Sequence, residues 1–190
     1  MIPYQKEKID NAICFFALEH RQKSGQPLTQ TYLYKYLAFV DFLSVEKIGV
    51  PAFGLEYRAM PRGPVPPSIY NKRHYLKTEL FEFKKEAETI YFVIPKKHPN
   101  LDYFSAFELA LMRRLISIHA TKYSSTNEIS DHSHKRITAW KRTFEKQEND
   151  FIDYSLQFDG DIMNKKEDEL TPAEENYLTY LAMKGTAKCR

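Results

Sequence analysis

Cysteine and long apolar runs are scarce in this sequence, and each scarcity excludes a class of protein. Two cysteines, Cys14 and Cys189, are too few for a disulfide framework, so we expect a reducing compartment. No run approaches the roughly 20 apolar residues that span a bilayer. The N-terminal segment MIPYQKEKID lacks the basic and apolar regions of a secretory signal. We therefore expect a cytoplasmic protein that does not act on a membrane.

The patterns of catalytic sites are also missing. Six glycines leave no glycine-rich phosphate loop, and Cys14 lies in an apolar run, where a thiol is inert. Ser133 precedes His134 without a nucleophile elbow. His132 and His134 would point about 200° apart on a helix, and no cysteine ligand lies near them. We expect no catalytic residue, metal or cofactor, and a metal-dependent or hydrolytic enzyme is only a rival interpretation.

Aromatic residues, in contrast, are abundant, and charge is unevenly distributed. The 13 tyrosines, 13 phenylalanines and 43% hydrophobic content can supply a folded core in 190 residues. Residues 1–145 hold 22 Lys/Arg and 15 Asp/Glu, a net charge of +7, whereas residues 146–190 hold 6 and 10, a net charge of −4. We predict a body, 1–145, and an acidic C-terminal extension, 146–190, whose terminal helix packs on the body.

Apolar residues at helical spacing predict several helices. The helices at residues 4–23, 29–48 and 101–120 are expected to form the core, and the second is apolar nearly all round. A Thr171–Glu174 capping box marks the start of the last helix. The remaining predictions are a helix from Ser124 or Ser125 through the segment ISDHSH, a short helix over 68–77, and a last helix that ends near Lys184, closed by Gly185.

Alternating apolar residues predict two β elements. Residues 53–66 are extended, with Leu55, Tyr57 and Ala59 on one side, and the prolines that follow exclude a helix. Leu80–Phe83 and Thr89–Ile94 flank a charged turn and predict a hairpin, which must gain a strand or pack on the helices. Its apolar faces are expected to be Phe81 with Phe83, and Ile90, Phe92 and Ile94. The predicted class is mainly α (α+β), a compact helical domain with a small β-hairpin or short antiparallel sheet.

A stiff segment at residues 55–70 is the candidate surface for a partner protein. Gly63-Pro64-Val65-Pro66 restricts the backbone, and neighbouring aromatic and arginine side chains are typical of binding hot spots. An elbow that only connects helices is the alternative. The residues expected to contact a partner are Tyr57, Arg58, Met60, Arg62, Val65 and Tyr70.

DNA binding is a competing interpretation. Helices followed by a hairpin are typical of a winged helix, and basic pairs such as Lys72/Arg73 and Arg113/Arg114 occur. These pairs are scattered over many elements, whereas a recognition helix needs them on one exposed face. We therefore expect a protein partner and no nucleic-acid partner.

The sequence resembles the Panacea domain (SocA-like antitoxin) family over about residues 7–145. The segment YLYKYLAFVDFL is similar to the family's KLLYFADF helix, the following GVP, Tyr57 and GPV steps resemble its yGxP…y…GPV continuation, and Ser133-His134 with Trp140 resembles its SH…W element. Val40 replaces a usual small residue, and Trp140 lies one residue farther from the histidine than in the family. The motif residues, which we expect to be structural, are Tyr36, Asp41, Gly49, Pro51, Gly63, Pro64, Val65, His134 and Trp140.

The resemblance implies an antitoxin. Family members neutralise varied toxins, usually encoded beside them, by direct contact. One branch is a proteolytic adaptor that delivers its toxin to a bacterial protease, and such domains also occur in prophages. We expect a bacterial antitoxin of a type II-like system that binds a cognate toxin. A DNA-binding transcriptional regulator or a phage-associated interaction protein is the alternative, and the toxin and the oligomeric state are left open.

Overall fold

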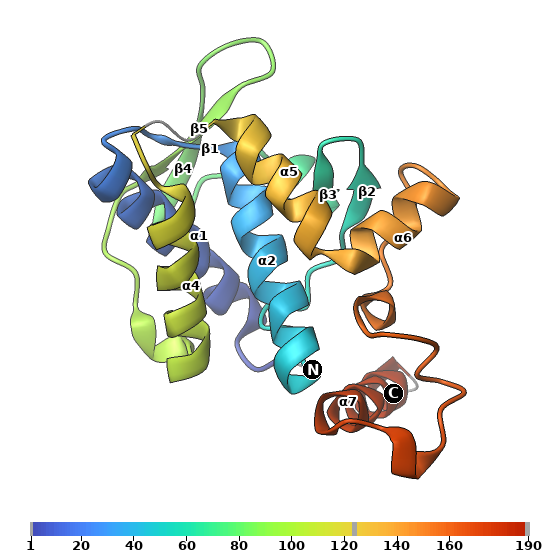
Figure 1. Ribbon diagram of the computed structural model, residues 1–190. Coiled ribbons are helices and arrows are strands. Elements are labelled where there is room, and N and C mark those ends of the chain that lie inside the picture. The colour runs from blue at the N-terminus through green and yellow to red at the C-terminus, as the bar shows by residue number, and fades with distance from the viewer. Residues whose placement is uncertain (1, 123–124, 189–190) are drawn as a thin grey trace.

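The computed structural model describes residues 2–122 and 125–188, and its elements surround one central helix, α2 (Figure 1). The predicted class, mainly α with a small antiparallel sheet, is confirmed. The helices are α1 (Gln5–Ser24), α2 (Gln30–Ile48), α3 (Pro67–Tyr70), α4 (Ala106–His119), α5 (Thr126–Arg136), α6 (Thr138–Lys146) and α7 (Pro172–Lys188), with 3-10 turns η1 (Leu101–Tyr103), η2 (Tyr154–Gln157) and η3 (Glu167–Glu169). The strands are β1 (Leu28–Thr29), β2 (Arg58–Met60), β3 (Gly63–Val65), β4 (Phe81–Lys85) and β5 (Tyr91–Pro95).

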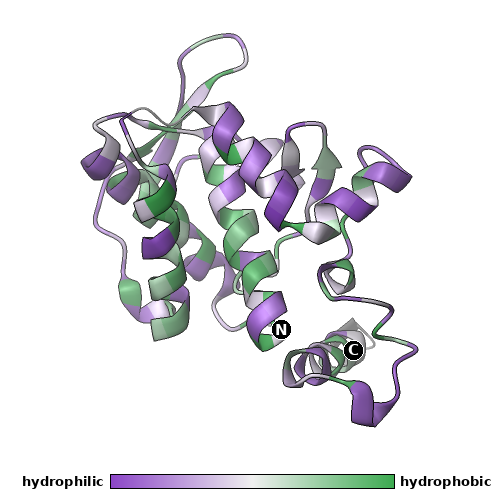
Figure 2. Ribbon diagram, in the orientation of Figure 1, coloured by the Kyte–Doolittle hydropathy of each residue, from purple (hydrophilic) through white to green (hydrophobic). Residues whose placement is uncertain are grey.

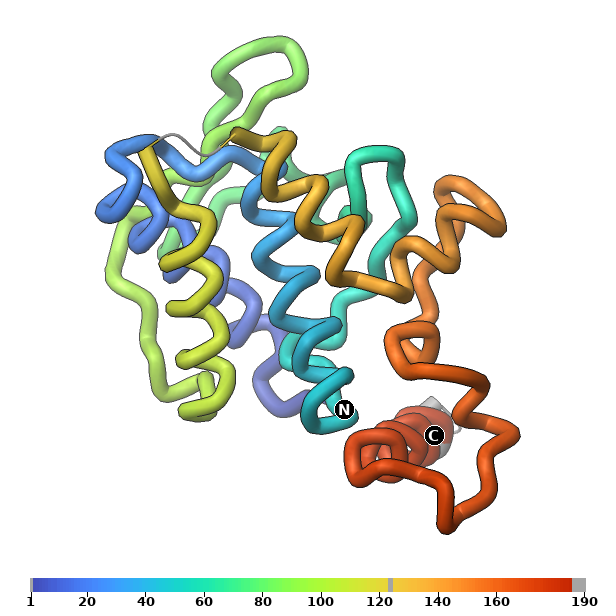
Figure 3. Tube along the Cα trace, viewed as in Figure 1, coloured from blue at the N-terminus to red at the C-terminus, as the bar shows by residue number. Residues whose placement is uncertain are grey.

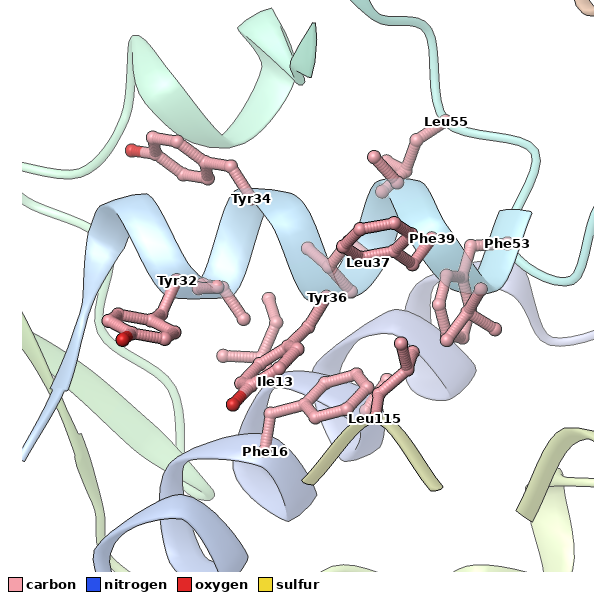
Figure 4. Close-up of a cluster of buried hydrophobic side chains, with 14 of the residues drawn as sticks. Ile13, Phe16, Tyr32, Tyr34, Tyr36, Leu37, Phe39, Phe53, Leu55 and Leu115 are labelled. Atoms are coloured by element: carbon pink, nitrogen blue, oxygen red, sulfur yellow. The ribbon is translucent and has the colours of Figure 1, made fainter. Parts of the chain in front are cut away.

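Helix α2 is the centre of the core because nearly all of its middle is apolar or aromatic. α1 and α4 pack against it, as predicted: Phe16 of α1 stacks on Tyr36 with ring centroids 4.8 Å apart, and Leu115 of α4 lies in the same cluster (Figure 4). α4 begins at Ala106, later than predicted, because a capping box between Ser105 and Glu108 starts the helix there. α5 and α6 are largely hydrophilic (purple in Figure 2). α5 packs on α2 and β3, and α6 packs on β2.

The predicted hairpin, β4–β5, gains a third strand. β1 pairs with β5, giving the antiparallel order β1-β5-β4, and the sheet packs on α1. The predicted apolar face of β5 is wrong. Phe83 pairs with Val93, and directly paired residues share a face, so Tyr91 and Val93 are buried while Ile90 is 44% exposed.

Two predicted helix ends are corrected by the structure, and one predicted helix start falls partly outside the described residues. α3 ends at Tyr70, and residues 71–75 form turns instead of continuing a helix to residue 77. α7 starts at the predicted capping box, where Glu174 and Thr171 exchange hydrogen bonds, but it runs through Gly185 to Lys188. Ser125 caps α5, whereas Ser124 and Cys189 lie outside the described residues.

Cys14 is buried, and its thiol donates to Lys97 O over 3.1 Å. Burial raises the pKa of this thiol to about 11, so it stays protonated at neutral pH. Within the part of the chain that the structure describes, no helix is both long and apolar enough to cross a membrane.

One buried carboxylate, that of Asp41, fixes the path of the chain after α2. Asp41 is 0% exposed, and the backbone N–H groups of residues 53–55 donate to it over 2.6, 3.1 and 3.3 Å. The Tyr57 hydroxyl donates to Oδ2 over 2.9 Å, and the Tyr154 hydroxyl lies 3.1 Å from Oδ2 and 2.6 Å from Leu55 O. Burial raises the pKa of Asp41 to about 6, although the donors favour the ionised form. At neutral pH this carboxylate ties α2 to two later segments.

The end of α2 also receives the last helix. The tube in Figure 3 shows the chain running from α6 past the end of α2 to α7. Gly49 ends α2 with φ +76°, and a Cβ there would lie 2.1 Å from Ala173 O and 2.7 Å from Tyr177 N. Val45, Phe158, Ile162 and Tyr177 form a small second core beside this contact. The absence of a side chain at Gly49 therefore lets α7 approach α2.

Replacing Asp41 by asparagine would turn an amide NH₂ toward groups that need an acceptor. A buried donor left unpaired costs about 1–3 kcal/mol, and the Asp41 carboxylate accepts from several such donors. We expect Asp41→Asn to lower the free energy of unfolding by about 3 kcal/mol or more, measured by urea denaturation. Asp10→Asn alters a partly exposed pair with Lys6 and is expected to change it by less than about 1 kcal/mol. Equal losses in both variants would contradict the role of Asp41.

Gly49 and Gly25 offer a matched test of α7 docking. Both end a helix, with φ +76° and +74°, so alanine introduces the same backbone strain of about 1–2 kcal/mol at each. At Gly25 nothing lies within 4 Å of the added Cβ. We expect Gly49→Ala to lose more unfolding free energy than Gly25→Ala and to expose residues 159–171 to limited proteolysis. Two variants that unfold alike and resist the protease alike would disprove docking through Gly49.

Candidate protein-binding surface

The segment expected to form an arm is a short hairpin, β2–β3, supported from behind. β2 pairs with β3 in an antiparallel register that joins Arg58 to Val65 and Met60 to Gly63. Trp140 of α6 donates from Nε1 to Met60 O over 3.0 Å, and its ring stacks on His134 at 3.9 Å. The tryptophan thus has the hydrogen-bond acceptor that a buried indole needs. His134 and Trp140 lie behind the hairpin, where they hold its turn in place.

The C-terminal extension pairs with the outer edge of β2. The N–H groups of Asn149 and Ile152 donate to Ala59 O and Tyr57 O, and Ala59 N–H donates to Asp150 O, all over 2.9 Å. The Arg58 guanidinium lies 4.1 Å from the centre of the Phe151 ring. The hairpin is therefore held on one side by α5 and α6 and on its edge by residues 149–152.

The six residues expected to contact a partner differ in exposure and fall into three groups. Tyr57 is 1% exposed and donates to Asp41, so its side chain lies in the core of the isolated chain and not on its surface. Arg62 is exposed at the hairpin turn. The other four are partly exposed on or beside the hairpin, and they are Arg58, Met60, Val65 and Tyr70.

The Gly63-Pro64 step lies close to α2 and α5. Gly63 has φ +96°, and a Cβ there would lie 2.7 Å from Ser133 Oγ and 3.0 Å from Lys35 Nζ. Glycine is needed at this position both for the backbone angle and for the close approach. Pro64 is buried, and its carbonyl accepts a hydrogen bond from Lys35 Nζ over 3.1 Å. The step is thus an anchor, and the partly exposed residues flank it.

The remaining motif residues lie in the core or near the end of α2. Tyr36 is 0% exposed, and its hydroxyl lies 3.0 Å from Nδ1 of His20. Pro51 is buried just after Gly49, where the chain turns toward the segment that Asp41 holds.

Beside the hairpin lies an open groove of about 490 Å³. It extends between the first turn of α2, the hairpin, the turn after α3 and the β4–β5 loop, where Gln30 Nε2 donates to Thr89 O over 2.8 Å. Three cationic residues line the groove and no carboxylate does. The lining residues are Thr29, Gln30, Thr31, Tyr34, Lys35, Met60, Pro61, Arg62, Val65, Tyr70, Arg73, Thr89, Ile90 and Thr126.

Lys35 is the unusual member of this lining. It is 1% exposed, and no carboxylate within residues 2–122 and 125–188 lies within ion-pair distance of its ammonium. Burial lowers the pKa of Lys35 to about 7, because water no longer stabilises the charged form. Lys35 is not among the contact residues predicted from the sequence. The available signal was a single lysine in the middle of an otherwise apolar stretch of α2.

Three further polar side chains of the groove have an atom without a hydrogen-bond partner. Tyr34 points to the opposite side of α2 from Tyr36, away from the α1–α4 core (Figure 4). Among the described residues, Tyr34 Oη, Gln30 Oε1 and Arg73 Nε are buried without a hydrogen-bond partner. The Arg73 guanidinium lies 3.7 Å from the centre of the Tyr70 ring. Buried polar groups are nearly always paired, so these atoms mark a place that can accept a ligand.

The two histidines considered as metal ligands, His132 and His134, contact different side chains. On α5, His132 Nδ1 lies 2.9 Å from His119 Nε2, whereas His134 stacks on Trp140. Burial lowers the pKa of His132 and of His134, which favours the neutral rings that pack here. Over the described parts of the chain, three or more histidine, cysteine, aspartate or glutamate side chains nowhere converge as a metal site would require.

Comparison with known proteins connects this geometry to a family. Neither the curated proteins nor the solved structures gave a match. The family model described as the antitoxin SocA-like, Panacea domain matches residues 33–141, more than half of the chain. The match begins in α2 and ends in α6, so it includes Asp41, the Gly63-Pro64 anchor and Trp140. The chain therefore belongs to the SocA-like antitoxin family and contains a Panacea domain.

Proposed function

We propose that this protein is a cytoplasmic antitoxin of a bacterial type II-like toxin–antitoxin system, which neutralises a cognate toxin by direct, non-catalytic binding. Membership of the SocA-like family supports the antitoxin role. The observation that carries the binding surface is the β2–β3 hairpin, which presents Arg58, Met60, Arg62 and Val65 from a backbone anchored on three other elements.

The hairpin has the properties of a preorganised contact surface. Because α6 and residues 149–152 already fix its backbone, binding would cost little ordering entropy. Arginine, methionine and tyrosine are enriched at protein interfaces, and the hairpin and α3 supply all three. A stable interface needs roughly 800 Å² from each partner. The total surface of the chain is 10,761 Å², so such an interface would occupy a small fraction of it.

Within the proposal, residues 1–145 form the toxin-binding body and residues 146–190 form a support for it. The extension supplies the strand-like edge at 149–152, the Tyr154 hydroxyl near Asp41 and the docked helix α7. Its net charge of −4 is opposite in sign to the net charge of +7 on the body. The extension therefore stabilises the binding surface without belonging to the matched family segment.

Co-expression with the product of the neighbouring gene tests the proposal. We expect growth arrest by that product to be relieved by the wild-type chain and by Arg113→Glu, an exposed change on α4. Arg62→Glu reverses the charge at the exposed hairpin turn and is expected to reduce rescue at least tenfold in colony count. Both arginines are exposed, so circular dichroism is expected to show both variants folded.

The same variants separate the other readings. Toxin inhibited by purified antitoxin indicates direct neutralisation, whereas toxin that disappears only in cells with an active protease indicates delivery for proteolysis. Rescue by Arg62→Glu equal to that by Arg113→Glu would refute the hairpin as the contact surface. Failure of the wild type to rescue, together with duplex DNA binding that weakens steeply with salt, would favour the DNA-binding alternative.

A further inference from the structure

We infer that the groove beside the hairpin is a carboxylate-binding site, and that it receives an acidic side chain from an apolar segment of the protein partner. In this arrangement an Asp or Glu carboxylate lies against Lys35, Arg62 and Arg73. The inference rests on the proposed function and names the chemistry that the groove recognises in the partner.

The charges of the groove call for an anion. Lys35, Arg62 and Arg73 all line it, and none of its lining residues is acidic. The Lys35 ammonium has three N–H donors, and Pro64 O is the acceptor that the structure gives it. The first turn of α2 also lines the groove and holds no acidic residue, and the N-terminal end of a helix favours negative charge.

The unpaired atoms indicate a ligand that has hydrogen-bonding groups and apolar surface in addition to its negative charge. Tyr34 Oη and Arg73 Nε can donate to a carboxylate, and Gln30 Oε1 can accept from a backbone N–H. Val65, Ile90 and Met60 add apolar surface along the same groove. A volume of about 490 Å³ lies in the range that holds a small ligand or a few side chains. Acidic and apolar groups in one short segment satisfy both kinds of lining.

A peptide segment fits this groove better than a nucleic acid does. Nucleic acids present phosphates along a continuous backbone, and proteins meet them with exposed arginines and lysines. Lys35 is 1% exposed and lines the groove next to the Gly63-Pro64 step, so an acidic side chain has to enter the groove to approach its ammonium. A flexible carboxylate on an extended chain has that reach.

The test uses the full chain and two blocked fluorescent peptides, one alternating leucine and glutamate, the other leucine and glutamine. At pH 6.5 we expect the glutamate peptide to bind at least tenfold more tightly by fluorescence anisotropy. Lys35→Met removes the buried ammonium, and Arg62→Gln removes a cation from the exposed turn. Both are expected to reduce this preference severalfold or more. Lys141→Met, at a side chain 63% exposed on α6, is expected to keep it.

The outcomes separate this inference from the proposed function, because the peptide assay needs no toxin. No preference in the wild type, or full preference in Lys35→Met, would overturn the inference even where growth rescue succeeds. Inorganic phosphate or duplex DNA that binds as tightly as the glutamate peptide, and also depends on Lys35, would overturn it too. If the preference for the glutamate peptide is present but growth rescue fails, the antitoxin proposal is refuted and the carboxylate-binding site is supported.

Lys35 also makes stability depend on pH. Its pKa is about 7 in the folded chain against 10.5 ordinarily, so between pH 7 and 9 the unfolded chain binds more protons and stability rises with pH. The facing groups titrate elsewhere, because burial lowers the pKa of His134 below its usual 6.5 and raises the pKa of Tyr34 well above 10.

Melting curves at pH 7, 8 and 9 measure this effect. We expect the Tm of wild type and of Lys141→Met to rise across the series. Lys35→Met is expected to show a smaller rise and a Tm at pH 7 at least as high as that of wild type, because it lacks a buried ammonium without a carboxylate partner. A lower Tm for Lys35→Met at pH 7 would show that Lys35 serves folding and would count against a ligand role.

Discussion

The hydrogen bonds around the Asp41 carboxylate are the interaction on which the rest of the structure depends. α2 is apolar nearly all round, so hydrophobic burial alone does not fix its rotation about its own axis. A single charge buried at one point of that helix removes the ambiguity, because only one orientation presents it to the N–H groups of residues 53–55. The two tyrosine hydroxyls then place the start of the hairpin and η2 relative to α2.

The candidate surface follows from that anchoring. Residues 53–57 leave Asp41 and lead directly into β2, so the hairpin begins at a fixed point. Gly63 brings the returning strand close to Lys35, and this closeness shields the lysine from water and lowers its pKa. The same geometry that makes the hairpin rigid therefore creates a buried cation beside it. Gly63 and Lys35 therefore belong both to the packing of the fold and to the candidate surface.

Helices α1, α2, α4, α5 and α7 and the β4–β5 hairpin could be predicted from the sequence because each depends on local spacing or capping, whereas α6 was not predicted. Tyr57 could not be placed, since alternation shows which residues share a side of a strand but not which side meets the core. The extent of α7 was missed because glycine often ends a helix, whereas Gly185 lies inside this one, at a cost of only about 1 kcal/mol relative to alanine. Lys35 was missed because its environment is built by Gly63 and Ser133, which are far from it in the chain.

Residues 149–152 cap the open side of β2 with backbone hydrogen bonds. A bare strand edge is a template for pairing with any other extended chain, and proteins cover such edges to avoid aggregation. Removal of the acidic extension would leave the β2 edge uncovered on a body with surplus positive charge. We expect the shortened chain to self-associate through that edge, which residues 149–152 cover in the intact chain.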